Sequence, residues 1–288
     1  MPLLSIFFIL IASIFHVLRD VMTKTSHHKL VFVWWISFCS FLMLLPFCLY
    51  FFIQAKPSLP LIVFSLGAGV VHALYWTSYA LAYDKGDITH VYPIIRSAPA
   101  LVLVFSILLL GERPDAWGII GILTITAGLY VINLKTLSFR TLSEPIKSIF
   151  TESHTRFAFV ALIFATGYLL LDKVAVDQMH PLAYSMVMTL SALGFFSLFI
   201  RKHLKGYWLM PIKRERKKVL WAAFFASVNY PLVLYALQLT NVSYVVAFRQ
   251  ISVVFAVLMG VFFLKEKLTR LRLMATIFIF LGAVLVAI

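Results

Sequence analysis

The sequence is dominated by uninterrupted apolar runs of the length that crosses a lipid bilayer. A helix needs about 20 apolar residues to span roughly 30 Å of hydrocarbon. Hydrophobic residues make up 62% of the chain and charged residues only 12%, whereas soluble domains are about half apolar and about a quarter charged. The runs also lack the alternation typical of membrane β-barrel strands. The sequence therefore predicts an all-α polytopic membrane protein.

The apolar runs predict ten transmembrane helices. The long run from Val219 to Leu264 contains a single charged residue, so it must fold back near residues 239–243 and form two of these helices. The expected spans cover about residues 2–20, 30–53, 60–83, 88–110, 115–133, 156–176, 181–200, 219–239, 243–264 and 270–288.

The polar stretch between the fifth and sixth spans divides the chain into halves. We expect a first five-helix repeat over residues 1–135, a linker over 136–155 and a second repeat over 156–288. Short motifs recur in the same order in both halves. They are Tyr79-Ala80-Leu81 with Tyr235-Ala236-Leu237, Leu110-x-Glu112 with Leu264-x-Glu266, and Gly128 with Gly282, each glycine sixteen residues after its glutamate. An odd number of helices per repeat inverts the second copy, as in many secondary transporters.

Two arginines lie inside predicted spans, one in each half. Arg96 is eight residues into its helix, about 12 Å deep at 1.5 Å per residue, and Arg249 is about six residues into the ninth span. Intramembrane charges usually face a bundle interior or a water-filled cavity, although a side chain near a helix end can also reach the headgroups. Pro93 and Pro99 flank Arg96 and predict a kink or hinge, with ordinary tolerance of proline in membrane helices as the alternative.

Aromatic and amide side chains collect in the third, fourth, eighth and ninth spans. His72, Tyr75 and Tyr79 share one helix face because they are three and four residues apart. A pocket wall is the favoured interpretation, and location at the membrane interface is the alternative. The expected substrate-binding residues are Arg96, Arg249, His72, Tyr75, Trp76, Tyr79, Tyr92, Tyr230, Tyr235 and Gln250.

Three titratable residues are candidates for coupling transport to an ion: His16, Asp20 and Asp172. Asp20 has the alternative of pairing with Lys24, four residues on, and Asp172 that of a solvated charge beside Lys173. No carboxylate is expected in mid-membrane, which favours exchange, facilitated transport or histidine-based coupling.

A resemblance rests on GDITHVYPIIRSAPAL through LLLGERPDAWGIIGILTITAGLYVI, and on VSYVVAFRQISVVFAVLMGVFFLKEKL through FLGAVLVAI. Over nearly its whole length the chain resembles the drug/metabolite transporter superfamily, specifically its EamA-type ten-helix group. The resemblance implies two inverted five-helix repeats, a central cavity lined mainly by helices 1–4 and 6–9, and peripheral helices 5 and 10. The second copy departs from the pattern, with Lys265-Glu266-Lys267 where the first has Gly111-Glu112-Arg113. We interpret Glu112 and Glu266 as structural turn residues.

Charge distribution bears on partners and orientation. The net charge of +14 arises mostly from short loops between spans, so we expect lipid bilayer and a small-molecule substrate as partners, and no nucleic acid. The loops after odd-numbered spans hold most of the Lys and Arg, and the positive-inside rule then places both termini outside. The resembled family usually has cytoplasmic termini. We expect a multi-pass protein of a bacterial inner membrane, as a monomer or homodimer.

The function predicted is secondary transport of a small organic anion or zwitterion by alternating access. Phosphonates, phosphorylated metabolites and amino acids are the expected substrate classes, because the family's substrates include several of these and the first half also resembles members associated with phosphonate utilisation. One alternative is an exporter of cationic or aromatic drug-like compounds. Another is a membrane-embedded lipid-modifying enzyme, which needs a His/Asp/Glu cluster whose spacing the sequence lacks. We therefore expect no enzymatic activity, cofactor or metal.

Overall fold

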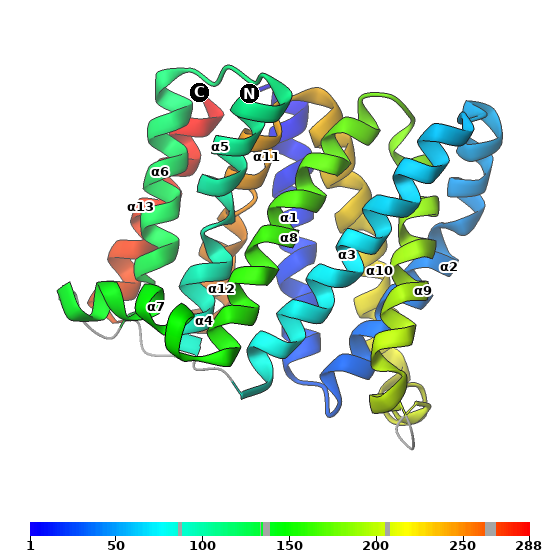
Figure 1. The fold of residues 1–288 in the computed structure, drawn as a ribbon, viewed down its shortest axis with the longest axis horizontal. Coiled ribbons are helices and arrows are strands. Elements are labelled where there is room, and N and C mark those ends of the chain that lie inside the picture. The colour runs from blue at the N-terminus through cyan, green and yellow to red at the C-terminus, as the bar shows by residue number, and fades with distance from the viewer. Residues whose placement is uncertain (86–87, 133, 135–138, 205–207, 263–268) are drawn as a thin grey trace.

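The computed structural model describes residues 1–288 except 86–87, 133, 135–138, 205–207 and 263–268, and helices joined by short connections make up the described part (Figure 1). The first half contains α1 (Leu3–Lys24), α2 (Lys29–Ala55), α3 (Leu59–Lys85), α4 (Ile88–Arg96), α5 (Ala98–Leu110) and α6 (Ala116–Val131). The second half contains α8 (Ser153–Val176), α9 (Pro181–Leu204), α10 (Met210–Leu239), α11 (Val242–Phe248), α12 (Ile251–Phe262) and α13 (Arg270–Ala287). Between them lies α7 (Phe139–Thr151).

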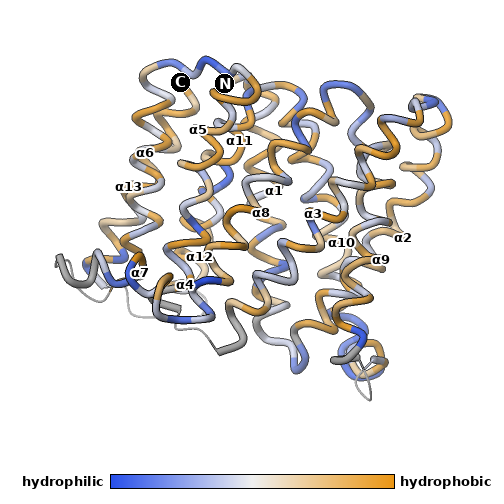
Figure 2. Tube along the Cα trace, in the orientation of Figure 1, coloured by the Kyte–Doolittle hydropathy of each residue, from blue (hydrophilic) through white to orange (hydrophobic). Residues whose placement is uncertain are grey.

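The number of membrane crossings agrees with the prediction. Nine segments of the described chain are long and apolar enough to span a bilayer, counting α4 with α5 and α11 with α12 as one segment each, and α6 is a tenth, shorter apolar helix. Hydrophobic residues follow these helices while hydrophilic residues gather at both ends of the bundle (Figure 2). The protein is a multi-pass integral membrane protein, and the predicted all-α fold is confirmed.

The two halves have inverted arrangements. The broken helix α4–α5 ascends in Figure 1, whereas α11–α12 descends. At the edge of the bundle α6 packs against α13 through small residues: a Cβ on Gly121 would lie 2.7 Å from the Gly282 carbonyl oxygen, and one on Gly128 would lie 2.9 Å from that of Ala275. Gly128 and Gly282 are 154 positions apart, as are Gly121 and Ala275. Each contact is therefore the image of the other, as a pseudo-two-fold axis requires.

The fourth span breaks at Ser97. In an uninterrupted helix the Ser97 N–H would bind the Pro93 carbonyl, but it donates to Ile94 instead, at 3.1 Å. The Ser97 hydroxyl replaces it and donates to the Pro93 carbonyl at 2.7 Å. Pro99, at the start of α5, has no N–H for the carbonyl four residues before it. The predicted kink is present, and the two prolines and one serine account for it.

The ninth span breaks at Arg249 and Gln250 without a proline. The Gln250 N–H donates to Ala247 at 3.0 Å, which leaves the Val246 carbonyl without its helical donor. The Gln250 side-chain amide supplies one at 3.2 Å. The Ser13 hydroxyl of α1 donates to the Arg249 carbonyl at 3.4 Å. Side chains thus satisfy the acceptors that the break releases.

Two stretches expected to be polar connections contain helix. α7 lies across the lower end of the bundle in Figure 1, within the linker. Its Ile146 and Phe150 are exposed, as in amphipathic helices that lie in the membrane interface. The basic loop before the eighth span is partly helical too, because α10 begins at Met210 and has a kink at Glu215.

Both termini lie at the same end of the bundle (Figure 1). The Met1 amino group donates to the Ala287 carbonyl at 2.9 Å. An even number of membrane crossings requires both termini to lie on the same side. The linker helix α7 lies at the opposite end of the bundle.

Candidate functional site

The breaks in the two inverted spans bring an arginine and an amide together inside the bundle. Arg96, the last residue of α4, donates from Nη1 to Gln250 Oε1 at 3.2 Å. Arg96 and Gln250 are 154 positions apart, the separation of the two repeats. Symmetry-related positions contact each other only near the axis that relates them. The contact therefore lies near the axis that relates the two halves, and both side chains are half-buried.

A second basic group comes from α1. Arg19 donates to Asp20 Oδ1 from Nη2 at 2.7 Å and from Nε at 3.1 Å. His16 Nδ1 lies 2.9 Å from Arg19 Nη2, and its Nε2 lies 3.3 Å from Asp20 Oδ2. The Asp20 side chain is 47% exposed. Asp20 thus pairs with Arg19 and His16, while the side chain of Lys24, its expected partner, lies outside the described residues.

These groups share one electrostatic environment, and we call Arg19, Arg96, Arg249, Gln250, His16 and Asp20 the arginine cluster. Arg96 and Arg249 both act electrostatically on His16, and Arg96 also acts on Asp20. Among the ion pairs of the described residues, Arg249 has no carboxylate within 4.0 Å. Among the described residues, the six that we group as the cluster include three guanidinium groups and one carboxylate, and charges inside a membrane protein usually face its interior or a water-filled cavity.

Tyrosines border the cluster. The Arg96 guanidinium lies 5.1 Å from the centre of the Tyr92 ring, within cation–π range. Tyr75 packs against Tyr79 at 5.8 Å and against Tyr168 of α8 at 5.2 Å between ring centres. Arg96 and Arg249 both act electrostatically on Tyr75. The pairing of Tyr75 and Tyr79 agrees with the face predicted from their spacing.

A separate buried set of polar groups lies around Asp172, and we call Asp172, His72, Tyr184 and Tyr230 the Asp172 network. The Tyr184 hydroxyl donates to Oδ1 and the Tyr230 hydroxyl to Oδ2, each at 2.6 Å. His72 Nε2 lies 3.0 Å from the Tyr230 hydroxyl and 3.7 Å from Oδ2. Asp172 is 1% exposed, so the alternative of a solvated charge is wrong. Lys173 turns the other way, to Asp177 and the Leu237 carbonyl.

Three expected pocket residues contact partners other than the arginines. Tyr230 is occupied in the Asp172 network. Trp76 packs against Phe196 of α9, with ring centres 5.4 Å apart. The Tyr235 hydroxyl lies 3.4 Å from His180 Nε2, beyond the end of α8. Trp76 and Tyr235 are therefore not included in the arginine cluster, and their role in substrate binding stays a prediction.

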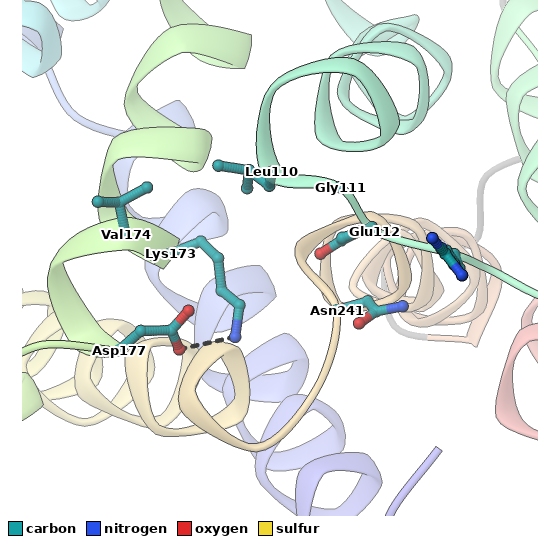
Figure 3. A pocket seen from close by; sticks show the side chains of 8 residues that line it. Leu110, Gly111, Glu112, Lys173, Val174, Asp177 and Asn241 are labelled. Atoms are coloured by element: carbon teal, nitrogen blue, oxygen red, sulfur yellow. Dashed lines mark hydrogen bonds and ion pairs between the residues drawn. The ribbon is translucent and has the colours of Figure 1, made fainter.

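The described residues also form a pocket of about 500 Å³ at the end of the bundle that holds the termini (Figure 3). Its lining comprises Leu110, Gly111, Glu112, Arg113, Lys173, Val174, Asp177 and Asn241. In Figure 3 the Lys173 side chain reaches across to Asp177, 2.8 Å away. The pocket lies at helix ends and is distinct from the arginine cluster.

Beside this pocket, loop carboxylates join the two halves. Glu112 accepts from the backbone N–H of Val242 at 2.5 Å and from the Ser243 hydroxyl at 2.6 Å, at the N-terminus of α11. Glu112 is therefore more than a turn residue, and Glu266 lies outside the described residues. Asp115 accepts from the Gly118 N–H and the Tyr244 hydroxyl, and these two bonds lower the pKa of Asp115.

Some of the grouped residues were not predicted. In the sequence, Arg19 belongs to the polar stretch that ends the first predicted span. In the structure α1 continues to Lys24, so Arg19 lies within the helix. Tyr168 and Tyr184 are single tyrosines in apolar spans, so no local spacing distinguishes them. Only the packing of α8 against α3, α9 and α10 reveals their partners.

Comparisons with known proteins agree with this architecture. The model of the EamA-like transporter family matches residues 3–134 and again residues 156–288. Among solved structures, one titled only "Crystal structure of protein" is 16% identical, with a TM-score of 0.71 over 99% of this chain and 96% of that one. At this identity the likeness concerns the fold alone. No curated protein matches the chain.

Proposed function

Since the chain belongs to the EamA-like transporter family, we propose that this membrane transporter carries a small organic anion or zwitterion through the arginine cluster. A phosphonate, a phosphorylated metabolite or an amino acid has the required acidic group. The observation that carries the proposal is the placement of Arg96 and Arg249 at the breaks of two inverted spans.

The charge balance of the cluster supports an anionic ligand. Arg19 is paired with Asp20 at 2.7 Å, and Arg96 contacts the amide of Gln250 from the other repeat. A carboxylate or phosphonate can accept charge-assisted hydrogen bonds from guanidinium groups. Tyr75, Tyr79 and Tyr92 would contact the remainder of the solute.

Alternating access follows from the inverted repeats. At the end that holds the termini, Glu112 and Asp115 tie the first half to α11. At the other end of α1, Asp20 remains substantially exposed. We propose that this conformation is closed near the termini, and that the repeats, residues 1–135 and 156–288, rock about the central contact to reverse the opening.

We also propose a bacterial inner membrane and external termini, from the excess of basic residues at the opposite end. A phosphatase fused after Ile288 would be active with external termini. A fluorescent protein fused there would be bright with cytoplasmic termini and would refute the assignment.

The test is a thermal-shift screen of the purified protein against methylphosphonate, methanesulfonate, glycerol 3-phosphate, alanine and choline. We expect the anions to raise the unfolding temperature of the wild type and to have no effect on Arg96→Gln. Arg113→Gln, at an exposed loop position, is the matched control and should respond like the wild type. Equal shifts in all three proteins would refute the proposal.

A charge swap tests the central placement directly. In the double variant Arg96→Gln with Gln250→Arg, the guanidinium moves to the symmetry-related position and stays near the axis. We expect the double variant to recover anion binding that Arg96→Gln has lost. Failure to recover, in a protein that unfolds as cooperatively as the wild type, would place the solute away from the axis.

The tyrosines favour a second candidate, a transporter of cationic or aromatic drug-like compounds. Tyr75, Tyr79 and Tyr168 form a continuous aromatic contact, which suits a quaternary amine. In that case choline would stabilise the wild type and Arg96→Gln equally, and the anions would stabilise neither.

A further inference from the structure

The Asp172 network contains an aspartate and a histidine that the proposed anion site does not use. Asp172 is 1% and His72 is 3% exposed. They come from α8 and α3, and their hydroxyl partners Tyr184 and Tyr230 come from α9 and α10. A buried ionisable group in a transporter requires a partner or a function.

The hydrogen-bond geometry determines one tautomer of His72. Nδ1 lies 3.0 Å from the Ala68 carbonyl oxygen. A carbonyl oxygen can only accept, so Nδ1 carries a proton. In a neutral ring Nε2 is then an acceptor, and it faces the Tyr230 hydroxyl at 3.0 Å and Asp172 Oδ2 at 3.7 Å.

With a neutral His72 and an ionised Asp172, the network has one proton fewer than its hydrogen bonds require. With Asp172 ionised and His72 neutral, the single hydroxyl proton of Tyr230 has two acceptors, Oδ2 and Nε2. One of them remains unsatisfied, and the buried group has a net charge of −1. Both conditions are costly away from water.

One added proton completes the network in either of two ways. If it sits on His72 Nε2, that nitrogen donates to the Tyr230 oxygen and Tyr230 donates to Asp172. If it sits on Asp172, the carboxyl group donates to Tyr230 and Tyr230 donates to His72. The two patterns interconvert when the Nε2 proton passes to the Tyr230 oxygen and the Tyr230 proton passes to Oδ2, and in both the network is electrically neutral.

We propose that the Asp172 network is the proton-binding site of this transporter, and that it takes up a proton from solution when the anion binds. The inference rests on the proposed function, because the anion is the one assigned to the arginine cluster. It makes the protein a proton–anion symporter.

Arg249 provides the link between the two sites. It acts electrostatically on Asp172 and on Tyr168, and the Tyr168 ring lies 4.1 Å from that of His72. The positive charge of Arg249 opposes the addition of a proton to the network. An anion bound to the arginine cluster offsets that charge, so proton and anion favour each other's binding, as linkage requires.

The other titratable groups around the network are accounted for. α9 and α10 contribute Tyr184 and Tyr230, which act on Asp172 directly. Tyr75 and Arg19 act on Tyr168 from α3 and α1. His16 and Asp20 belong to the arginine cluster, so the experiment must separate their protonation from that of Asp172.

The experiment is calorimetric titration of methanesulfonate into the purified protein, because this probe keeps one negative charge throughout the pH range used. Parallel titrations in bis-Tris and in Tris, amine buffers with different protonation enthalpies, measure the protons taken up on binding. Sulfonate buffers are avoided because they resemble the probe. The variants are Asp172→Asn and His72→Gln, with Asp177→Asn as the matched control. Asp177 lies on the same side of the bundle, outside the network, in an exposed pair with Lys173.

We expect the wild type and Asp177→Asn to take up a fraction of one proton per methanesulfonate bound. Asp172→Asn should still bind the probe with no uptake, and His72→Gln should behave likewise if Asp172→Asn does not fold. Binding without uptake in the wild type, or undiminished uptake in the variants, overturns the proton site and leaves the anion site standing. Absence of methanesulfonate binding in the wild type overturns both.

Discussion

The packing of α6 against α13 gives a quantitative test of the two-fold arrangement. In Gly282→Ala the new Cβ would lie 2.7 Å from the Gly121 carbonyl oxygen and 3.0 Å from the Ile125 backbone nitrogen. Ordinary contacts begin at about 3.5 Å, so the helices would have to separate by several tenths of an ångström. Overpacking of this kind costs about 1–3 kcal/mol.

The helix propensity of alanine complicates this value, since Gly→Ala in a helix gains about 1 kcal/mol. Gly194→Ala in α9 is the matched control, because a Cβ there would meet nothing within 4 Å. The difference between the two variants cancels the propensity term and leaves about 1–3 kcal/mol. Reversible unfolding in mixed detergent micelles measures it. Equal stability of Gly282→Ala and Gly194→Ala would refute the close backbone approach.

Three further predictions concern the ends of the helices. Glu112→Gln removes the charge at the N-terminus of α11 and should cost about 1 kcal/mol of unfolding free energy, measured by the same method. Burial lowers the pKa of His180, whose ring stacks on Phe51 at 3.8 Å and whose Nδ1 accepts the Leu182 N–H. Folding favours the neutral ring. The stabilisation that this gives to the free energy of unfolding is therefore complete above about pH 6.5 and is lost as the pH falls below that value. The stability of His180→Gln should therefore fall less than that of the wild type between pH 7.5 and pH 5. Lys56, at the C-terminus of α2, has φ 42° and ψ 58°, so Lys56→Gly should raise the unfolding free energy by about 0.5–1 kcal/mol.

Each of these has a clear contrary result. Unchanged stability of Glu112→Gln would mean that the negative charge of Glu112 does not contribute to holding the N-terminus of α11 in place. Parallel pH curves for the wild type and His180→Gln would show that another group dominates acid destabilisation. A less stable Lys56→Gly would show that contacts of the lysine side chain outweigh its backbone strain.

The spans were predictable because bilayer thickness sets the length of an apolar run. Most predicted ends agree with the structure within a few residues, as for residues 181–200 and α9. The linker helix α7 was missed because its polar residues dominate its composition. Its apolar positions, such as Ile146 and Phe150, repeat at a helical interval that would have indicated an interfacial helix.

The site was predictable only in part, for a physical reason. A charge inside an apolar run is conspicuous in a sequence, so Arg96 and Arg249 could be chosen as candidates. A carboxylate near a helix end is ambiguous, because its burial depends on what other helices place around it. Asp172 is buried by Tyr184 and Tyr230, which are 12 and 58 residues away in sequence. The break at Gln250 was equally hidden, since no proline marks it.

The contact between Arg96 and Gln250 has a consequence for how inverted repeats can work. If the repeats exchange conformations to reverse the opening, most residues of one half take up the environment of their counterparts in the other. Two symmetry-related side chains that already touch remain neighbours after the exchange. A solute held by this pair therefore stays bound while the helices on either side move. Because one member is charged and the other is neutral, the two end states differ in energy even without a solute. An anion at the axis would change that difference only through its unequal interaction with the two states, and the proton that we propose to bind near Asp172 would supply a second such inequality.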